Sequence, residues 1–140
     1  MLKIISLFML ILTASCFLSG RKGQKQGLVS PSGNYVAYMP IEPSKNVDMK
    51  VPVWTPSLKD KKGKLLYRDE NSDLSGYHNS YWDWNGQNTG IERFWVYNSD
   101  TGVVTVYYQE GKKWIKKIYD KKKDKIRPPG IIREKLKKSP

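Results

Sequence analysis

The sequence predicts an all-β domain, a small antiparallel meander that forms an open sheet pair or a sandwich, with a flexible segment before it and a basic tail after it. Short runs rich in Val, Tyr, Trp and Ile alternate with turn residues, which is the pattern of strands and hairpins. No segment before residue 120 has the apolar spacing of a useful helix. All five Trp and all nine Tyr lie between residues 34 and 119, so the core is expected there.

The first three predicted strands are short or interrupted. They cover residues 35–41, 51–58 and 63–68. Because proline cannot donate to a ladder of backbone hydrogen bonds, Pro52 and Pro56 place the second run at an edge or in an irregular strand.

The later strands are better defined, at residues 79–84, 91–98, 103–109 and 114–119. Tight turns rich in Asn, Asp and Gly join the last three into a meander. Alternation along the first strand of this meander places Phe94 and Val96 on one face and Trp95 and Tyr97 on the other. Both faces are therefore expected to be partly covered.

Residues 1–15 have the layout of a secretory signal, with one Lys, an apolar run from Ile4 to Leu12, and small residues after it. The run is much shorter than the roughly 20 residues that span a bilayer, so a permanent membrane helix is the poorer interpretation. The segment Leu12-Thr13-Ala14-Ser15-Cys16 resembles the lipobox of bacterial lipoproteins, although Thr13 stands where Leu or Val is usual. The resemblance implies cleavage before Cys16 and attachment of a diacylglyceryl group to its thiol.

A lipidated Cys16 would hold the protein at a membrane, since each buried methylene adds about 0.8 kcal/mol. No acidic residue follows in Phe17, Leu18 and Ser19. By resemblance to lipoproteins of bacteria with two membranes, this favours the outer membrane, facing the periplasm or the surface. The alternatives are an ordinary secreted protein with an incidental cysteine and an uncleaved anchor. Because Cys16 is the one cysteine of the chain, no intramolecular disulfide is possible.

These patterns divide the chain into four predicted segments. They are a signal peptide at 1–15, a lipidated cysteine and flexible tether at 16–33, a β domain at 34–119, and a basic, largely disordered tail at 120–140. The tail has no aromatic residue and ends in residues 131–138, which could form about two turns of amphipathic helix.

Two further resemblances concern the β domain. Residues 30–38 and 95–102 resemble the strand entry and inner hairpin of β-propeller blades. The roughly 86 residues of the domain allow two blades at most, whereas a closed propeller needs at least about four, so a sheet pair remains the prediction. The blocks 81–84 and 93–102 are also similar to small uncharacterised exported bacterial proteins, a resemblance that carries no known activity.

The net charge of +12 belongs mainly to the C-terminal end, where residues 112–140 hold thirteen Lys or Arg against three acidic residues. A cationic segment near an anionic membrane gains about 1 kcal/mol for each Lys or Arg close to it. Membrane or phosphate-bearing envelope polymers are its expected contacts, and a solubilising tail is the alternative. No nucleic-acid partner is expected, because the segment is exported and lacks aromatic residues for base stacking. The expected contact residues are Lys121, Lys122, Lys123, Lys125, Arg127, Arg133, Lys135, Lys137 and Lys138.

The residue types that usually carry catalysis are scarce. Nucleophilic catalysis needs a base beside the nucleophile, and the chain offers one His, His78, and no free thiol once Cys16 is acylated. Residues 69–73 are faintly like a calcium loop, but Leu74 replaces the turn Gly and Ser80 replaces the bidentate Glu. Asp83 and Glu92 could form a glycosidase pair only if the fold placed them together. No catalytic residue, metal or cofactor is therefore expected, and the protein is predicted not to be an enzyme.

The segment at residues 81–88 is the most suggestive candidate surface. Trp82 and Trp84 share one face of a strand, and beside Asn85, Gln87 and Asn88 they could stack on sugar rings while the amides bind hydroxyls. The alternative is that both indoles fill the core of a domain that has no disulfide.

Together these features predict a lipid-anchored envelope protein whose non-catalytic β domain binds a protein or an envelope polymer. The first alternative is an immunity-type or hydrolase-inhibitor lipoprotein, and a toxin gene next to the gene of this protein would favour it. The second is a glycan-binding or glycan-active protein.

Overall fold

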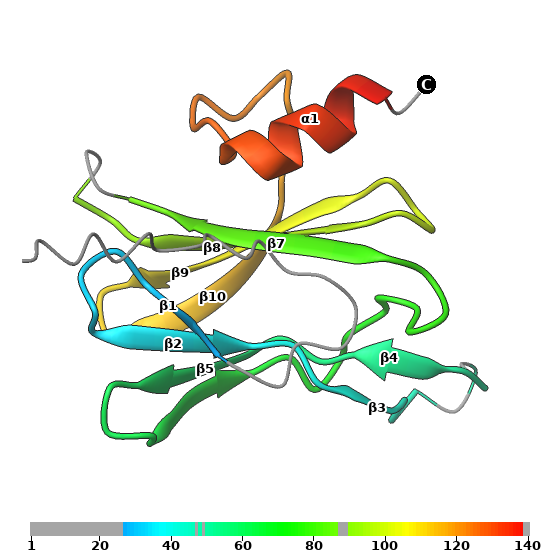
Figure 1. The fold of residues 1–140 in the computed structure, drawn as a ribbon, viewed down its shortest axis with the longest axis horizontal. Helices are drawn as coiled ribbons and strands as arrows, with labels where there is room; N and C mark the ends of the chain where they lie inside the picture. Colours follow the sequence, from blue (N-terminus) through cyan, green and yellow to red (C-terminus); the bar gives the residue numbers. More distant parts are fainter. Residues whose placement is uncertain (1–26, 47, 49, 87–89, 139–140) are drawn as a thin grey trace, which may run out of the picture.

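The computed structural model describes residues 27–46, 48, 50–86 and 90–138 of the chain. Within these residues the chain forms two four-stranded antiparallel sheets, a two-stranded sheet and the helix α1 (Gly130–Lys138). Figure 1 shows the two large sheets stacked face to face, with α1 lying across the outer face of the second sheet. The all-β prediction is confirmed, and the sheet pair is a sandwich.

The first sheet has the strand order β1-β2-β5-β6. Its strands are β1 (Leu28–Val29), β2 (Tyr35–Tyr38), β5 (Ser57–Asp60) and β6 (Leu65–Arg68). β1 lies in the segment predicted as tether, so the fold begins before residue 34. Leu28 pairs with Ala37, and its carbonyl accepts a hydrogen bond of 2.8 Å from the Trp84 indole of the other sheet. Those two contacts are the reason why a two-residue edge strand is held in place.

The second sheet is the predicted meander, in the order β10-β9-β8-β7. Its strands are β7 (Ser80–Asn85), β8 (Arg93–Asn98), β9 (Val104–Glu110) and β10 (Lys113–Ile118). Gly102 and Gly111 have φ values of 67° and 60° in the two hairpin turns, where an L side chain would be strained. The positive φ values therefore occur in the two turns that the sequence predicts.

The two early runs are each divided between a large sheet and the small one. β3 (Ile41–Pro43) and β4 (Pro52–Trp54) pair with each other and extend the first sheet to one side. The break follows from Pro40 and Pro56, which cannot donate backbone hydrogen bonds. Across the break the amide of Thr55 donates to the carbonyl of Pro40 at 2.8 Å. The prediction of a single strand at 35–41 was wrong, whereas the irregular strand predicted at 51–58 is confirmed.

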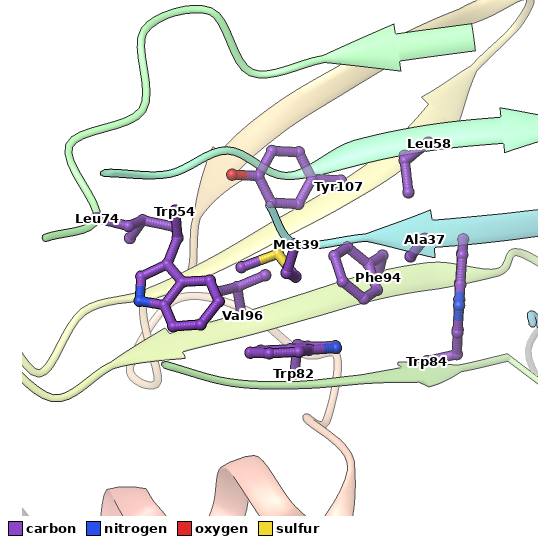
Figure 2. Close-up of a cluster of buried hydrophobic side chains, with 10 residues drawn as sticks. All are labelled: Ala37, Met39, Trp54, Leu58, Leu74, Trp82, Trp84, Phe94, Val96 and Tyr107. Atoms are coloured by element: carbon purple, nitrogen blue, oxygen red, sulfur yellow. The ribbon is translucent and has the colours of Figure 1, made fainter. Parts of the chain in front are cut away.

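The main core fills the space between the two large sheets. Its aromatic members come from β4, β7, β8 and β9, and Figure 2 shows their rings gathered between the sheets. The buried members are Ala37, Met39, Trp54, Leu58, Leu74, Trp82, Trp84, Phe94, Val96 and Tyr107. Phe94 and Val96 lie on this inner face, as alternation along β8 predicts.

A second core lies on the opposite face of β8, beneath α1. Trp95 and Tyr97 point to this side and pack with Val104, Val106 and the fully buried Ile132 of the helix. The tail predicted to be largely disordered is thus ordered here from residue 120 to 138. The physical reason is the apolar outer face of the second sheet, which gives the helix a surface to bury against. Among the described residues, no helix is long and apolar enough to cross a membrane.

Candidate functional site

Trp82 and Trp84 do not form an exposed stacking face. Trp82 is 3% exposed and Trp84 is 6% exposed, and both project between the sheets (Figure 2). The Trp82 ring packs against Trp54 at a centroid distance of 5.5 Å. Burial of both indoles corrects the prediction that they stack on a sugar and confirms the alternative of core packing. A domain without disulfides gains much of its stability from such large side chains.

Asn85 belongs to the structure of the second sheet rather than to an open surface. Its side-chain oxygen accepts a hydrogen bond of 2.9 Å from the Trp95 indole, and its amide nitrogen donates 3.1 Å to the carbonyl of Arg127. Asn85 therefore ties β7 to the segment that leads into α1. Gln87 and Asn88, the other predicted ligand residues, lie outside the described residues.

Residues 120–138, called the C-terminal cap below, carry all nine cations that the sequence singles out. Figure 1 shows this segment and α1 together on the outer side of the second sheet. Seven of the nine are exposed, and Arg133 and Lys135 are half-buried. The Lys135 ammonium lies 3.8 Å from the centre of the Tyr81 ring, a contact that fixes the helix against β7. The cap is thus a cationic surface held on an ordered support.

The acidic residues of the cap are already engaged. Asp124 is paired with Lys117 of β10 and accepts a hydrogen bond of 2.7 Å from the backbone of Asp120. These contacts lower the pKa of Asp124, the backbone hydrogen bond being the larger cause. Glu134 is paired with Lys137 at 2.9 Å. Among the described residues, no acidic side chain pairs with Lys121, Lys122, Lys125, Arg127, Arg133 or Lys138.

The described chain begins at an edge of the first sheet. Leu28 pairs with Ala37, so Gly27 lies next to Tyr38 in the edge strand, and an added Cβ on Gly27 would stand 2.3 Å from Val36. β1 also lies beside β7, because Leu28 and Val29 line a hollow together with Asp83, Trp84 and Asn85.

A hollow of about 580 Å³ lies at one end of the sandwich, where the β1–β2 and β9–β10 turns meet the β7–β8 connection. It is called the end hollow below. Its lining side chains come from both sheets, and sequence reasoning missed most of them. The polar and aromatic ones are Ser32, Asn34, Tyr35, Glu92, Gln109 and Trp114. The available signal was the turn predicted between the strands at 103–109 and 114–119, and in the structure Gln109 pairs with Trp114 across this turn.

Two hydrogen-bonded links shape the end hollow. The Glu92 carboxylate accepts hydrogen bonds of 2.6 Å and 2.8 Å from the backbone amide and the hydroxyl of Ser32. The Tyr35 hydroxyl donates 3.2 Å to the side-chain oxygen of Gln109. Both links join the first sheet to the second, so the hollow is part of the fixed end of the sandwich. Asp83 lies in a different hollow, beside Leu28 and Val29, so the fold does not bring it into the end hollow with Glu92.

Ser75, His78 and Asp100 form an arrangement that the sequence did not predict. The Ser75 hydroxyl lies 3.2 Å from Nδ1 of His78, and Nε2 of His78 lies 3.5 Å from Asp100. This set has the residue types of a hydrolase triad. However, Ser75 is only 5% exposed, and the backbone amides of Gly76, Tyr77 and His78 all donate within the protein. Within the described residues, the amides of this turn are thus engaged with the protein itself, so the turn offers no free pair of donors of the kind that binds an oxyanion.

The acidic segment at 69–73 is held by cations of the protein itself. Asp69 is 3% exposed, accepts a hydrogen bond of 2.7 Å from the Tyr107 hydroxyl and forms an ion pair of 2.8 Å with Lys116. Burial raises the pKa of Tyr107 well above its usual range, and the Asp69 charge adds to the shift. Glu70 is paired with Arg68 and Lys45. Across the described residues, no group of three potential ligands is placed to hold a metal ion.

Comparisons with protein-family models, curated proteins and solved structures found no match to this chain. Its function is therefore inferred from its own residues, which offer two candidate surfaces of different chemistry: the C-terminal cap and the end hollow.

Proposed function

We propose that the protein is a lipid-anchored, non-catalytic envelope protein whose C-terminal cap binds an anionic envelope polymer. The anchor is the predicted diacylglyceryl group on Cys16, and the predicted location is the outer membrane in a bacterium that has one. The observation that carries the binding function is the ordered cap, in which six cations form no ion pair with any described residue.

The docking of the cap on the second sheet favours a binding function over the alternative of a solubilising tail. A disordered basic tail loses conformational freedom when it binds, which weakens its affinity. Here α1 is already docked through Ile132, and Asn85 holds the preceding segment. Most of this loss of conformational freedom has therefore already occurred when the protein folds. Preorganised cations also keep a fixed spacing, which suits a polymer with regularly repeated phosphate or carboxylate groups.

The test compares two triple variants of residues 17–140, which contain the whole described sandwich. The first replaces Lys121, Lys122 and Lys125 of the cap with Gln. The control makes the same change at Lys61, Lys62 and Lys64, equally exposed lysines in the β5–β6 turn of the first sheet. The probes are soluble polyphosphate and vesicles that contain phosphatidylglycerol, each at two salt concentrations.

At about 1 kcal/mol for each lysine at an anionic surface, the cap variant should bind polyphosphate roughly 100-fold more weakly. The control variant should bind nearly as well as the wild type, and salt should weaken the wild type most. Equal losses in the two variants would contradict the assignment to the cap. Binding to vesicles without binding to polyphosphate would contradict the polymer and show that the cap binds a membrane surface instead.

The anchor is tested separately in the full chain. With Cys16→Ser, the protein should leave the membrane fraction, and mass spectrometry of the wild type should find a cleaved, acylated N-terminus at Cys16. An intact leader in the wild-type protein, or a cleaved terminus without acyl chains, would contradict the lipoprotein assignment while leaving the cap experiment valid.

A further inference from the structure

The end hollow differs from the rest of the molecule in charge. The chain as a whole has a net charge of +12, with 25 Lys and Arg residues. Among the described residues that line the end hollow there is no Lys or Arg, and Glu92 gives the hollow one carboxylate. A phosphate or other anion would find no cation there and would meet a like charge. The end hollow is therefore suited to an uncharged ligand.

Several polar groups of the end hollow have bonding capacity left. The side-chain oxygen of Gln109 is used by Tyr35, which leaves its amide nitrogen as a donor. Among the described residues, no group forms a hydrogen bond with the side chain of the exposed Asn34, which offers both a donor and an acceptor. Each oxygen of Glu92 accepts one hydrogen bond from Ser32 and can accept another.

The aromatic wall of the end hollow is rigid. Trp114 packs edge-on against Tyr35, with ring centres 5.1 Å apart, and Tyr35 is stacked on the buried Trp84 at 6.3 Å. The indole N–H of Trp114 is buried and has no acceptor among the described residues, whereas the indoles of Trp54, Trp84 and Trp95 all donate. Trp114 is thus a fixed ring with one unused donor.

Glycines open the space in front of this wall. Gly90 and Gly111 line the end hollow, and a Cβ built on either would meet nothing within 4 Å. The volume of about 580 Å³ lies within the range of small-molecule sites, roughly 300–1000 Å³. A ligand with many hydroxyl groups and one apolar face would use both the amides and the rings.

From these features we infer that the end hollow binds a neutral saccharide of one or two sugar units, with the sugar against Trp114 and Tyr35 and its hydroxyls on Asn34, Gln109 and Glu92. This site lies apart from the C-terminal cap, and its ligand is uncharged. The inference therefore goes beyond the polymer binding proposed above and does not depend on it.

The test uses the full chain in a zwitterionic detergent that has no sugar headgroup. The probes are maltose, cellobiose and N,N′-diacetylchitobiose, with inorganic phosphate as the charged comparison. Nuclear magnetic resonance of the indole N–H groups follows each tryptophan, and the Trp114 signal is identified by its loss in Trp114→Phe. The test variant is Asn34→Ala. The matched control is Asn71→Ala, an equally exposed asparagine in the turn after β6.

At least one sugar should shift the Trp114 signal in a saturable way that added salt does not weaken. Loss of one hydrogen bond in Asn34→Ala should raise the dissociation constant about 3- to 10-fold, and Asn71→Ala should leave it unchanged. No shift with any of the three sugars up to its solubility limit would overturn the inference. So would an equal response to phosphate, or a dissociation constant that Asn34→Ala does not alter. A salt-sensitive loss of polyphosphate binding in the cap variant is a separate result, so either proposal can fail without the other.

Discussion

The burial of Ile132 makes the docking of α1 testable by a single substitution. Ile132 is 0% exposed and packs beneath the helix with Trp95, Tyr97, Val104 and Val106. Ile132→Ala removes three buried carbons, which at about 0.8 kcal/mol each is a loss of roughly 2.4 kcal/mol. The cavity left behind adds to this value, so we expect the free energy of unfolding to fall by about 3 kcal/mol.

The measurement has a global and a local part. Urea unfolding followed by tryptophan fluorescence gives the change in free energy. Hydrogen exchange at residues 130–138 reports α1 itself, because an isolated helix of 9 residues is unstable in water and should exchange quickly once undocked. Exposure of Trp95 and Tyr97 should also increase the binding of a hydrophobic dye.

Ile118→Ala provides the matched control. Ile118 ends β10 and is 53% exposed, so the same change of side chain there should cost less than about 0.5 kcal/mol. If the two variants lost the same stability, or if the amides of α1 were unprotected in the wild type, the helix would not be docked. The cap would then be the disordered tail that its composition indicates.

Three further predictions concern the aromatic residues. Tyr107→Phe removes the 2.7 Å hydrogen bond to the buried Asp69, and urea unfolding should show a loss of about 1.5 to 3 kcal/mol; a loss below about 0.5 kcal/mol would contradict this. Burial, aided by the charge of Asp69, raises the pKa of Tyr67 to about 12 and that of Tyr107 well above its usual range. Both keep their protons at a pH where an unfolded Tyr, with a pKa of about 10, has lost its own. Stability should therefore be complete below about pH 10 and fall as the pH rises towards 12, and tyrosinate absorbance at about pH 11 should be lower in the native than in the unfolded protein. A double-mutant cycle of Lys135→Met and Tyr81→Leu should give a coupling of about 0.5 to 1 kcal/mol, and a value of zero would show that the cation and the ring do not interact.

The second sheet was predictable because its determinants are local. Turn residues set the two hairpins, and alternation along β8 assigned Phe94 and Val96 to the core and Trp95 and Tyr97 to the other side. The first sheet was predicted less well, because β1 and the division of the early runs depend on distant partners. The Trp84 indole and the carbonyl of Pro40 supply these contacts, and a single sequence does not reveal them.

The candidate sites show the same division between local and distant determinants. The cations of the C-terminal cap can be recognised from the amino-acid composition alone. The ordered structure of the cap, however, depends on an apolar surface that only the folded sheet provides. The end hollow is assembled from three separate turns, and its key link joins Ser32 to Glu92 across 60 residues of sequence. The aromatic pattern at 81–88 drew attention to Trp82 and Trp84, whereas the half-buried Tyr35 and Trp114 carry the candidate ring surface.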